Sequence, residues 1–222
     1  MTSGGRPTTP PVGDPAFWRD LYARGQDGWD LGRPSPSLEA HLAHERPPGR
    51  RVAVPGCGRG HDARLWARAG FEVWGFDFAP EPLTAARALA EREGLSVAFE
   101  QRDIFELASD YGAFFDGLWE YTCFCAIDPA RRDDYAELAA RLLRPGGWLL
   151  ACFFPMTPGG PAAPGTPGAA ERPAGPPFPV TEAEVRRLFE PRFELIDAYL
   201  PAGSPEARRG REWMVFARRL SA

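Results

Sequence analysis

Three glycines and one acid form the pattern in this sequence that most directly indicates chemistry. Gly56, Gly58 and Gly60 lie within five residues, directly after the short apolar run 52–54. Asp77 ends the next apolar run. Glycines let the backbone approach a nucleotide-like ligand, and an acid at the end of the following strand can accept hydrogen bonds from ribose hydroxyls. The pattern therefore predicts a cofactor site.

The ends of later strands add candidates, because parallel strands present their carboxyl ends at one edge of a sheet. Asp103 and Ile104 follow the predicted strand 95–99, and a polar segment follows the predicted strand 114–121. Asp103 could accept from an adenine amino group, with Ile104 and Phe78 packed on the ring.

The glycine spacing and the missing lysines narrow the cofactor. Gly-x-Gly-x-Gly brings the last glycine one residue earlier than the dinucleotide fingerprint does. All 26 basic residues are Arg, which excludes a P-loop, a pyridoxal Schiff base and a kinase. S-adenosylmethionine is therefore the better candidate, its methionine end seated on Gly56–Gly60. An NAD-type oxidoreductase stays open as the alternative from another class.

Alternating helices and strands must position these residues. Predicted helices at 61–69, 80–93 and 128–143 separate apolar runs, which is typical of a doubly wound, mostly parallel sheet. Two final strands, 193–200 and 213–218, are close enough to pair as an antiparallel edge. Asp14-Pro15 predicts an N-terminal helix start, and Thr181-Glu-Ala-Glu184 predicts a capping box.

We expect a single domain over 14–222 behind a disordered leader, 1–13. The segment 155–179 contains nine prolines and five glycines, so it predicts a long, mobile loop inserted into that domain.

Composition limits the partners. The formal net charge is −4 and the pI about 5.5, which argues against a nucleic-acid surface. No apolar run approaches the roughly 18 residues of a membrane span.

Four cysteines are too few for a disulfide framework and suggest a reducing cytoplasm. His41 and His44 lack a third metal ligand, so we expect no metal site. We expect a monomer that acts on a small molecule.

Several motifs in order carry a family resemblance. They are Trp18, Gly25, Trp29-Asp30-x-Gly32-Arg33-x-x-Pro36, Val54-Pro-Gly-Cys-Gly-Arg-Gly-His-Asp62, Glu120-Tyr-Thr-Cys-Phe-Cys-Ala-Ile-Asp-Pro, Leu-Arg-Pro-Gly-Gly at 143–147 and Gly175-Pro-Pro-Phe-Pro-Val. Together they resemble the thiopurine methyltransferase superfamily and, within it, the halide and thiol methyltransferases. The resemblance covers roughly 17–218. It implies a class I S-adenosylmethionine-dependent methyltransferase with a Rossmann-like, seven-stranded sheet.

The resemblance also implies roles for single residues. The residues implied to bind the cofactor are Trp18, Trp29, Gly56, Cys57, Gly58, Asp77, Phe78, Asp103, Ile104 and Glu120. Those implied to bind the acceptor are Tyr121, Thr122, Phe124, Cys125 and Arg211, and Tyr121 and Arg208 are the implied catalytic residues.

The acceptor implied by the resemblance is a halide, hydrosulfide, thiocyanate or small thiol. A thiopurine-like heterocycle, tellurite or selenite is an alternative with the same cofactor, and a binding module without activity is another. Two features depart from the family. The loop after Phe154 is longer than expected, and Trp213-Met214 stand where a polar continuation is expected.

Overall fold

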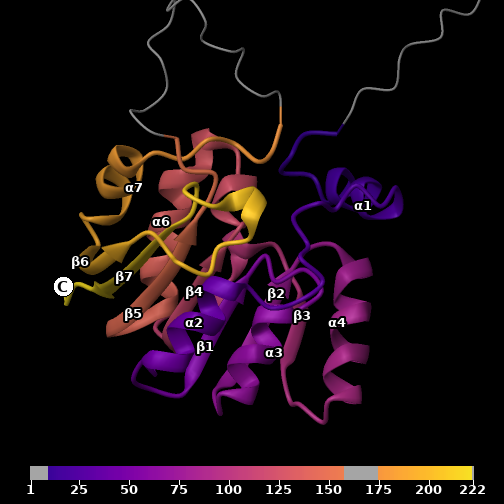
Figure 1. Cartoon of the computed structure of the whole chain (residues 1–222), viewed down its shortest axis with the longest axis horizontal. Coiled ribbons are helices and arrows are strands. Elements are labelled where there is room, and N and C mark those ends of the chain that lie inside the picture. Colours follow the sequence, from indigo (N-terminus) through magenta and orange to yellow (C-terminus); the bar gives the residue numbers. More distant parts are fainter. Residues whose placement is uncertain (1–9, 158–174, 222) are drawn as a thin grey trace, which may run out of the picture.

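The computed structural model describes residues 10–157 and 175–221, which form one mixed sheet with helices on both faces (Figure 1). The strands are β1 Arg51–Pro55, β2 Glu72–Asp77, β3 Ala98–Gln101, β4 Phe115–Tyr121, β5 Leu143–Phe153, β6 Phe193–Tyr199 and β7 Trp213–Arg219. Their order is β3-β2-β1-β4-β5-β7-β6. The first five are parallel, and β7 pairs antiparallel with both β5 and β6. The predicted doubly wound sheet with an antiparallel C-terminal edge is confirmed.

The helices connect these strands as the alternation predicts. They are α1 Pro15–Ala23, α2 Pro36–His44, α3 His61–Arg68, α4 Pro80–Arg92, α5 Ala108–Tyr111, α6 Arg132–Leu142 and α7 Glu182–Phe189. Four short 3-10 helices, η1 Ile104–Glu106, η2 Phe124–Ala126, η3 Pro129–Arg131 and η4 Glu206–Arg208, lie in the connections. The Asp14 side chain accepts a hydrogen bond from Ala16 N, as the predicted N-cap requires.

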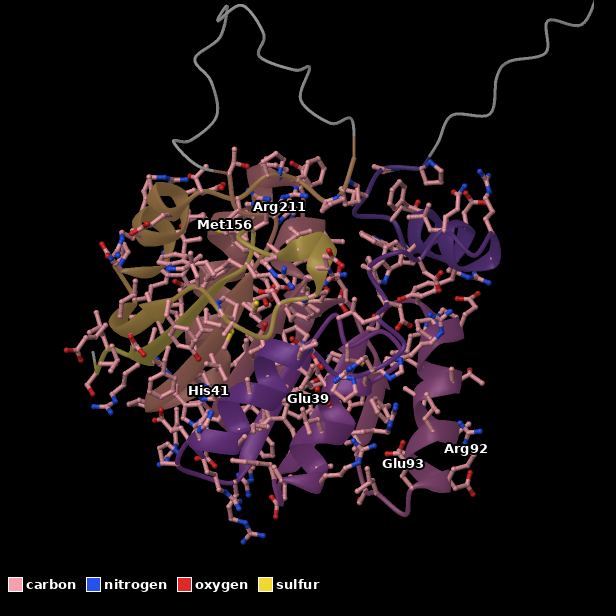
Figure 2. The ribbon with its side chains drawn as sticks, in the orientation of Figure 1. Glu39, His41, Arg92, Glu93, Met156 and Arg211 are labelled. Carbon is pink, nitrogen blue, oxygen red and sulfur yellow. The ribbon has the colours of Figure 1, made fainter. Side chains whose placement is uncertain are left out.

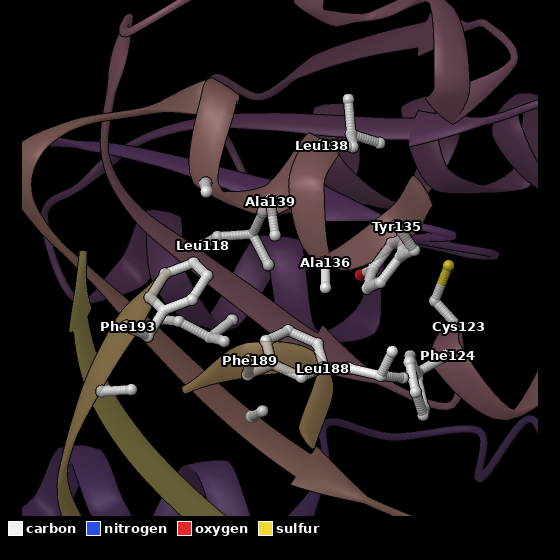
Figure 3. Packing of buried hydrophobic residues seen from close by; sticks show 14 of the residues in the cluster. Leu118, Cys123, Phe124, Tyr135, Ala136, Leu138, Ala139, Leu188, Phe189 and Phe193 are labelled. Atoms are coloured by element: carbon white, nitrogen blue, oxygen red, sulfur yellow. The ribbon is translucent and has the colours of Figure 1, made fainter. Parts of the chain in front are cut away.

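The hydrophobic core has two halves, one on each face of the sheet. Successive residues of a strand point to opposite faces, so in β1 Ala53 packs on one side and Val52 and Val54 on the other. Helices α2, α3 and α4 cover the face of Val52. Helices α6 and α7 cover the other face, where Tyr135 and Phe189 are fully buried (Figure 3).

Strand pairing corrects two local predictions, and burial accounts for one departure from the family pattern. Strand β3 begins at Ala98 rather than at Leu95, because only the segment 98–101 pairs with β2. Strand β5 begins at Leu143, before the predicted turn at 145–147, because Leu143 already pairs with Phe115. The residue pair Trp213-Met214 starts β7 and is buried there, which explains the apolar departure from the family pattern.

The capping box at Thr181 is only half formed. The Thr181 hydroxyl accepts a hydrogen bond from Glu184 N at 3.1 Å. The Glu184 carboxylate does not return to the backbone but accepts from Arg132, which is almost completely buried. A tertiary ion pair has therefore replaced the second half of the box.

All four cysteines are free thiols. Among the described residues, no helix combines the length and the hydropathy needed to cross a membrane.

Candidate active site

The main cavity, about 610 Å³ in volume, opens at the carboxyl ends of the central strands. The connections from β1 and from β4 leave the sheet in opposite directions at this point, which is where ligands bind in doubly wound folds. We distinguish two parts of its lining. The strand wall consists of Gly56, Asp77, Phe78, Asp103 and Ile104, and the loop wall consists of Phe154, Gly175, Pro176, Pro177, Ala207 and Arg208.

The glycine turn of the strand wall requires its glycines. Gly56 and Gly60 have φ of +60° and +66°, a region that other residues rarely adopt. A Cβ on Gly56 would lie 2.9 Å from Cys123 Sγ, and one on Gly60 would lie 2.6 Å from the Phe99 ring. The turn can therefore keep bare backbone against the cavity.

Asp77 is held at the end of β2 by the same turn. Its Oδ2 accepts from Gly58 N and its Oδ1 from Ala79 N, both at 2.9 Å. Burial raises the pKa of Asp77 to about 6, although these backbone hydrogen bonds act in the opposite direction. A buried carboxylate can accept hydrogen bonds from ribose hydroxyls, and the bare glycine backbone beside it leaves room for the nucleoside, so the residues fit S-adenosylmethionine.

Two further residues of the strand wall, Asp103 and Ile104, come shortly after β3 in the sequence. Asp103 begins η1, where its Oδ1 accepts from Phe105 N at 2.9 Å. This bond holds Ile104 and Phe105 on the cavity. Arg131 reaches the same region from η3, with its guanidinium carbon 3.5 Å from the centre of the Phe105 ring.

Aromatic side chains from α1 and the loop after it close the cavity on another side. The Trp29 ring meets the Trp18 ring at 5.5 Å and the Tyr22 ring at 5.4 Å, both edge to face. Both tryptophans were predicted here, but Tyr22 was not. Its spacing of four residues from Trp18 puts the two on one helix face, so helical periodicity could have identified it.

A chain of polar contacts runs behind the loop wall. Arg208 donates to Tyr121 Oη at 2.5 Å and to Trp29 O at 2.8 Å. Tyr121 donates to Glu212 Oε1 at 2.6 Å, and Ser37 donates to Glu212 Oε2 at 3.1 Å. Glu212 is fully buried. The sequence analysis gave Glu212 no role, although Glu212 ends the segment Arg208-Arg-Gly-Arg-Glu212, which begins with the implied catalytic arginine.

This contact chain defines what Tyr121 can do. Burial and the Glu212 carboxylate hold the pKa of Tyr121 far above its ordinary value, against the opposing effect of Arg208. The Tyr121 phenol therefore stays neutral, and its hydrogen is committed to Glu212. Tyr121 can orient Arg208, but it cannot act as a general base near neutral pH.

Thr122 has an unusual backbone. Its φ is +61°, a conformation that is costly for a β-branched residue. Thr122 and Cys125, which the resemblance implies to bind the acceptor, both line the main cavity. The Cys125 thiol contacts Thr122 O at 3.4 Å. Burial and the nearby Glu120 raise the pKa of Cys125 to about 12.

Glu120 and Phe124 are predicted site residues that the structure places in the core instead. The Glu120 side chain accepts from Cys123 N at 3.1 Å, from Phe124 N at 2.7 Å and from the Tyr135 hydroxyl. Burial raises the pKa of Glu120 to about 7, although these hydrogen bonds lower it. Strand alternation turns Glu120 toward α6, so it holds the turn after β4 rather than facing the cavity.

The Phe124 ring lies 5.7 Å from the Phe189 ring (Figure 3) and 5.4 Å from the Phe153 ring, centre to centre. The 3-10 turn η2 directs this side chain back into the core, where it is 1% exposed. Contact between Phe124 and an acceptor is therefore not supported.

Arg211, labelled in Figure 2, is exposed. It is not one of the residues that line the main cavity. Its guanidinium carbon is 5.3 Å from the centre of the Phe154 ring, while that of Arg208 is 4.9 Å from the same ring. The two arginines thus contact Phe154, but only Arg208 also lines the cavity. Cys57, Gly58 and Tyr121 line a second, smaller cavity instead.

The ends of the proline-rich segment are described, and they support the loop wall. Met156 pairs with Val180 as an isolated bridge, and Phe178 N donates to Cys125 O at 2.8 Å. These contacts hold Gly175–Pro177 against the cavity. The middle of the loop predicted at 155–179 lies outside the described residues, as does most of the predicted leader.

Known proteins match the chain over most of its length. The family model described as thiopurine S-methyltransferase (TPMT) matches residues 13–217. A protein named probable thiol methyltransferase 2 from Arabidopsis thaliana is 30% identical over 204 residues, covering 88% of this chain and 81% of the relative. Thiocyanate methyltransferase 1 from Brassica oleracea is 30% identical with the same coverage. Thiopurine S-methyltransferase from Pseudomonas fluorescens is 29% identical, covering 82% of this chain and 84% of the relative.

A solved structure supports the fold. The 1,6-didemethyltoxoflavin-N1-methyltransferase of Burkholderia thailandensis, solved with S-adenosylhomocysteine, superposes with a TM-score of 0.70 at 23% identity. The match covers 98% of this chain and 94% of that one.

Proposed function

Because this chain belongs to the thiopurine S-methyltransferase family and is an S-adenosylmethionine-dependent methyltransferase, we propose that it methylates the sulfur of a small thiol. Hydrosulfide, thiocyanate and halides are smaller acceptors that the same chemistry admits. The relatives named as thiol and thiocyanate methyltransferases support this acceptor class.

The observation that carries the proposal is the position of Arg208. Its guanidinium lies on the loop wall of a cavity whose other residues there are Phe154, glycine, proline and alanine. A cation in mostly apolar surroundings attracts and desolvates a soft anion, which makes such an anion a better nucleophile. Tyr121 and Trp29 O fix the direction of the guanidinium.

The proposed reaction needs no general base. A thiol with a pKa of about 8.5 is partly ionised at neutral pH, and a nearby arginine raises that fraction. Bound S-adenosylmethionine supplies an electrophilic methyl group. The thiolate forms the new carbon–sulfur bond as the methyl–sulfonium bond breaks, and the released electron pair stays on the sulfur of S-adenosylhomocysteine.

The residues of the chain prepare this displacement. Asp77 and the glycine turn hold the donor at the strand wall, while Arg208 holds the anion at the loop wall. Trp18, Trp29 and Tyr22 exclude water, whose removal favours a step that neutralises opposite charges. Cys125 also lines the main cavity, and its raised pKa keeps its thiol protonated. The Cys125 thiol therefore does not compete with the acceptor for the methyl group.

A thiopurine-like heterocycle is the second candidate. The aromatic side of the cavity and the bacterial relative named thiopurine S-methyltransferase favour it. A heterocyclic acceptor would bind to the same Arg208 guanidinium, and its ring would cover more of the apolar surface of the loop wall.

A screen of single acceptors, each assayed by itself, separates these candidates. The purified protein is incubated with S-adenosylmethionine and, in separate reactions, with thiophenol, mercaptopurine, hydrosulfide, thiocyanate or iodide. S-methyl product and S-adenosylhomocysteine should form in equal amounts with thiophenol, at a higher kcat/KM than with iodide. Turnover of mercaptopurine above thiophenol would favour the heterocycle. Donor binding without turnover of any sulfur acceptor would contradict the proposal.

A further inference from the structure

One loop is bonded to both sides of the main cavity. The α1–α2 loop, residues 24–35, contributes Trp29 to the cavity lining. Arg208 of the loop wall donates to Trp29 O at 2.8 Å. Arg59, in the middle of the glycine turn, is ion-paired with two aspartates of the same loop. The α1–α2 loop therefore connects the glycine turn to the cation of the loop wall.

Arg59 holds the α1–α2 loop through both ends of its guanidinium. Its Nη2 lies 2.5 Å from Asp27 Oδ2, and its Nη1 donates to Asp30 Oδ2. The exposed fractions of the Arg59, Asp27 and Asp30 side chains are 32%, 19% and 13%, so solvent screens these pairs less than it screens surface pairs. Burial lowers the pKa of Arg59, but the hydrogen bonds to Asp30 and Asp27 outweigh burial and raise that pKa. Arg59 is therefore charged and committed to the loop.

The two aspartates fix the peptide group that Arg208 contacts. Asp30 N donates to Asp27 O at 2.8 Å, and the carbonyl of the same peptide is Trp29 O, the acceptor for Arg208. A peptide group is planar, so the directions of its N–H and C=O are fixed relative to each other. By holding Asp27 and Asp30, Arg59 therefore sets the direction in which Trp29 O meets the Arg208 guanidinium.

His61 adds a weaker contact to Asp30. Arg64 can only donate, so its 3.2 Å contact with His61 Nδ1 places the hydrogen of a neutral His61 on Nε2. That Nε2 is buried 3.2 Å from Asp30 Oδ1, but it makes no hydrogen bond to any residue in the described ranges 10–157 and 175–221. Asp30 Oδ1 accepts instead from Gly32 N at 2.7 Å. The permanent charge that holds Asp30 is therefore that of Arg59.

Two acceptors orient the guanidinium of Arg208, and they are held in different ways. Tyr121 Oη, at 2.5 Å, is held by Glu212, whereas Trp29 O depends on the contacts of Arg59. A guanidinium is a planar fork with fixed donor directions. If Trp29 O moves, one of the two bonds is lost and the fork can rotate about the other.

We infer that Arg59 is a positioning residue for methyl transfer: through Asp27 and Asp30 it holds Trp29 O, which keeps the Arg208 guanidinium directed at the acceptor. Arg59 lines the smaller cavity and is not among the residues that line the main one. It therefore acts on the acceptor through Arg208. The inference rests on the proposed function, in which Arg208 attracts the acceptor anion.

A double-mutant cycle tests the inference. The kcat/KM for thiophenol is measured in the wild type, in Arg59→Gln, in Arg208→Gln and in the double variant. Arg59→Gln alone should lower kcat/KM roughly 10- to 100-fold, the loss that follows when a group meeting the substrate is displaced by up to about 1 Å. In the Arg208→Gln background the same change should cost less than about twofold, because the guanidinium that Arg59 positions is then absent.

The Kd for S-adenosylhomocysteine, measured by calorimetry, separates the two sides of the cavity. It should stay within about threefold of the wild-type value in Arg59→Gln, since the inferred effect is on the acceptor. Arg68→Gln breaks an ion pair with Glu93 on the neighbouring helix α3 and is the matched control. It should change neither kcat/KM nor this Kd.

Asp30→Asn breaks the same contact from the other partner. The asparagine side-chain oxygen can still accept from Gly32 N, so the loop keeps that bond. Asp30→Asn should give the same loss of kcat/KM as Arg59→Gln, and the two changes together should cost no more than either alone. This variant also replaces Arg59→Gln in the cycle if the latter does not fold.

Three results would overturn the inference. A full loss from Arg59→Gln in the Arg208→Gln background would give Arg59 a role that does not involve Arg208. A Kd for S-adenosylhomocysteine that rises as much as kcat/KM falls would make Arg59 a donor-binding residue. A wild-type kcat/KM in both Arg59→Gln and Asp30→Asn would show that the ion pairs do not position Arg208.

The proposed function can fail separately. If the wild type does not methylate thiophenol, the proposed acceptor is wrong, and the cycle is measured with the acceptor of the screen that has the highest kcat/KM. If no acceptor is methylated, the proposed function is contradicted, and the inference about Arg59 with it.

Discussion

The two walls of the main cavity are built in different ways. The strand wall comes from consecutive strand–turn units, in which Asp77 is the last residue of β2 and Asp103 comes shortly after β3. The loop wall comes from segments far apart in the chain, with Arg208 bonded to Tyr121 across 87 residues of sequence and to Trp29 across 179. Residue spacing in the sequence predicts the strand wall, whereas the loop wall depends on the whole fold. The proposed donor site on the strand wall is therefore better defined than the proposed acceptor site on the loop wall.

The largest expected effect is at the loop wall. Arg208→Gln removes the cation that attracts the acceptor, and loss of one such group costs roughly 10²- to 10³-fold in rate. We expect kcat/KM for thiophenol to fall by that factor while the Kd for S-adenosylhomocysteine changes less than threefold. Arg209→Gln, on the exposed neighbour, should leave both unchanged. A parallel loss of donor affinity would show that the two walls are not independent.

Asp77→Asn should affect the strand wall. The carboxylate accepts from Gly58 N and Ala79 N and, by our proposal, from ribose hydroxyls. Hydrogen bonds to charged groups contribute about 1.5–3 kcal/mol, so we expect donor affinity to weaken roughly 10- to 150-fold in calorimetry. Asp110→Asn, at an exposed ion pair, is the matched control. If Asp77→Asn raised the KM for the acceptor and left the Kd for the donor unchanged, the strand wall would bind the acceptor rather than the donor.

The pH dependence of donor affinity should follow Asp77. Its pKa of about 6 means that the carboxylate becomes protonated as the pH falls through that value. Ribose hydroxyls bind the ionised form better, so affinity should be about tenfold weaker at pH 5 than at pH 7. The Asp77→Asn variant should lack this dependence. A wild-type affinity that is constant over the same range would contradict the assignment.

Asp77 has the opposite effect on the stability of the free protein. Its folded-state pKa is raised above the unfolded value of 3.8. Its contribution to the free energy of unfolding is therefore fully present below the unfolded pKa and is lost as the pH rises through about 6. Thermal unfolding of the wild type and of Asp77→Asn between pH 4 and 7 measures the difference.

The smallest expected effect is at Arg131, which lies over Phe105 beside the strand wall. An exposed cation–π contact contributes about 0.5–1 kcal/mol. Arg131→Gln should therefore weaken S-adenosylhomocysteine binding by roughly two- to fivefold. Arg92→Gln, at the far end of α4 (Figure 2), should have no effect. If Arg131→Gln changed only the KM for the acceptor, Arg131 would contribute to the acceptor site rather than to the donor site.

Some sequence predictions failed where a side chain had two possible directions. Glu120, Tyr121 and Phe124 lie within five residues of sequence, and all three were assigned to the site. Strand alternation and the turn η2 send Glu120 and Phe124 into the core, while Tyr121 reaches Arg208 and Glu212. The alternation was predictable, but the face on which the cavity opens was not.

The sequence by itself determined the alternating fold, the glycine turn, Asp77 and the methyl donor. These depend on local backbone requirements and on motifs that keep their spacing within one strand–turn–helix unit. Only the tertiary structure decided that Glu212 holds Tyr121, that Tyr22 joins the aromatic side and that Arg59 binds Asp27 and Asp30. Those contacts join segments that are far apart in the sequence, so residue spacing does not predict them. The segments come together only when the complete sheet has formed.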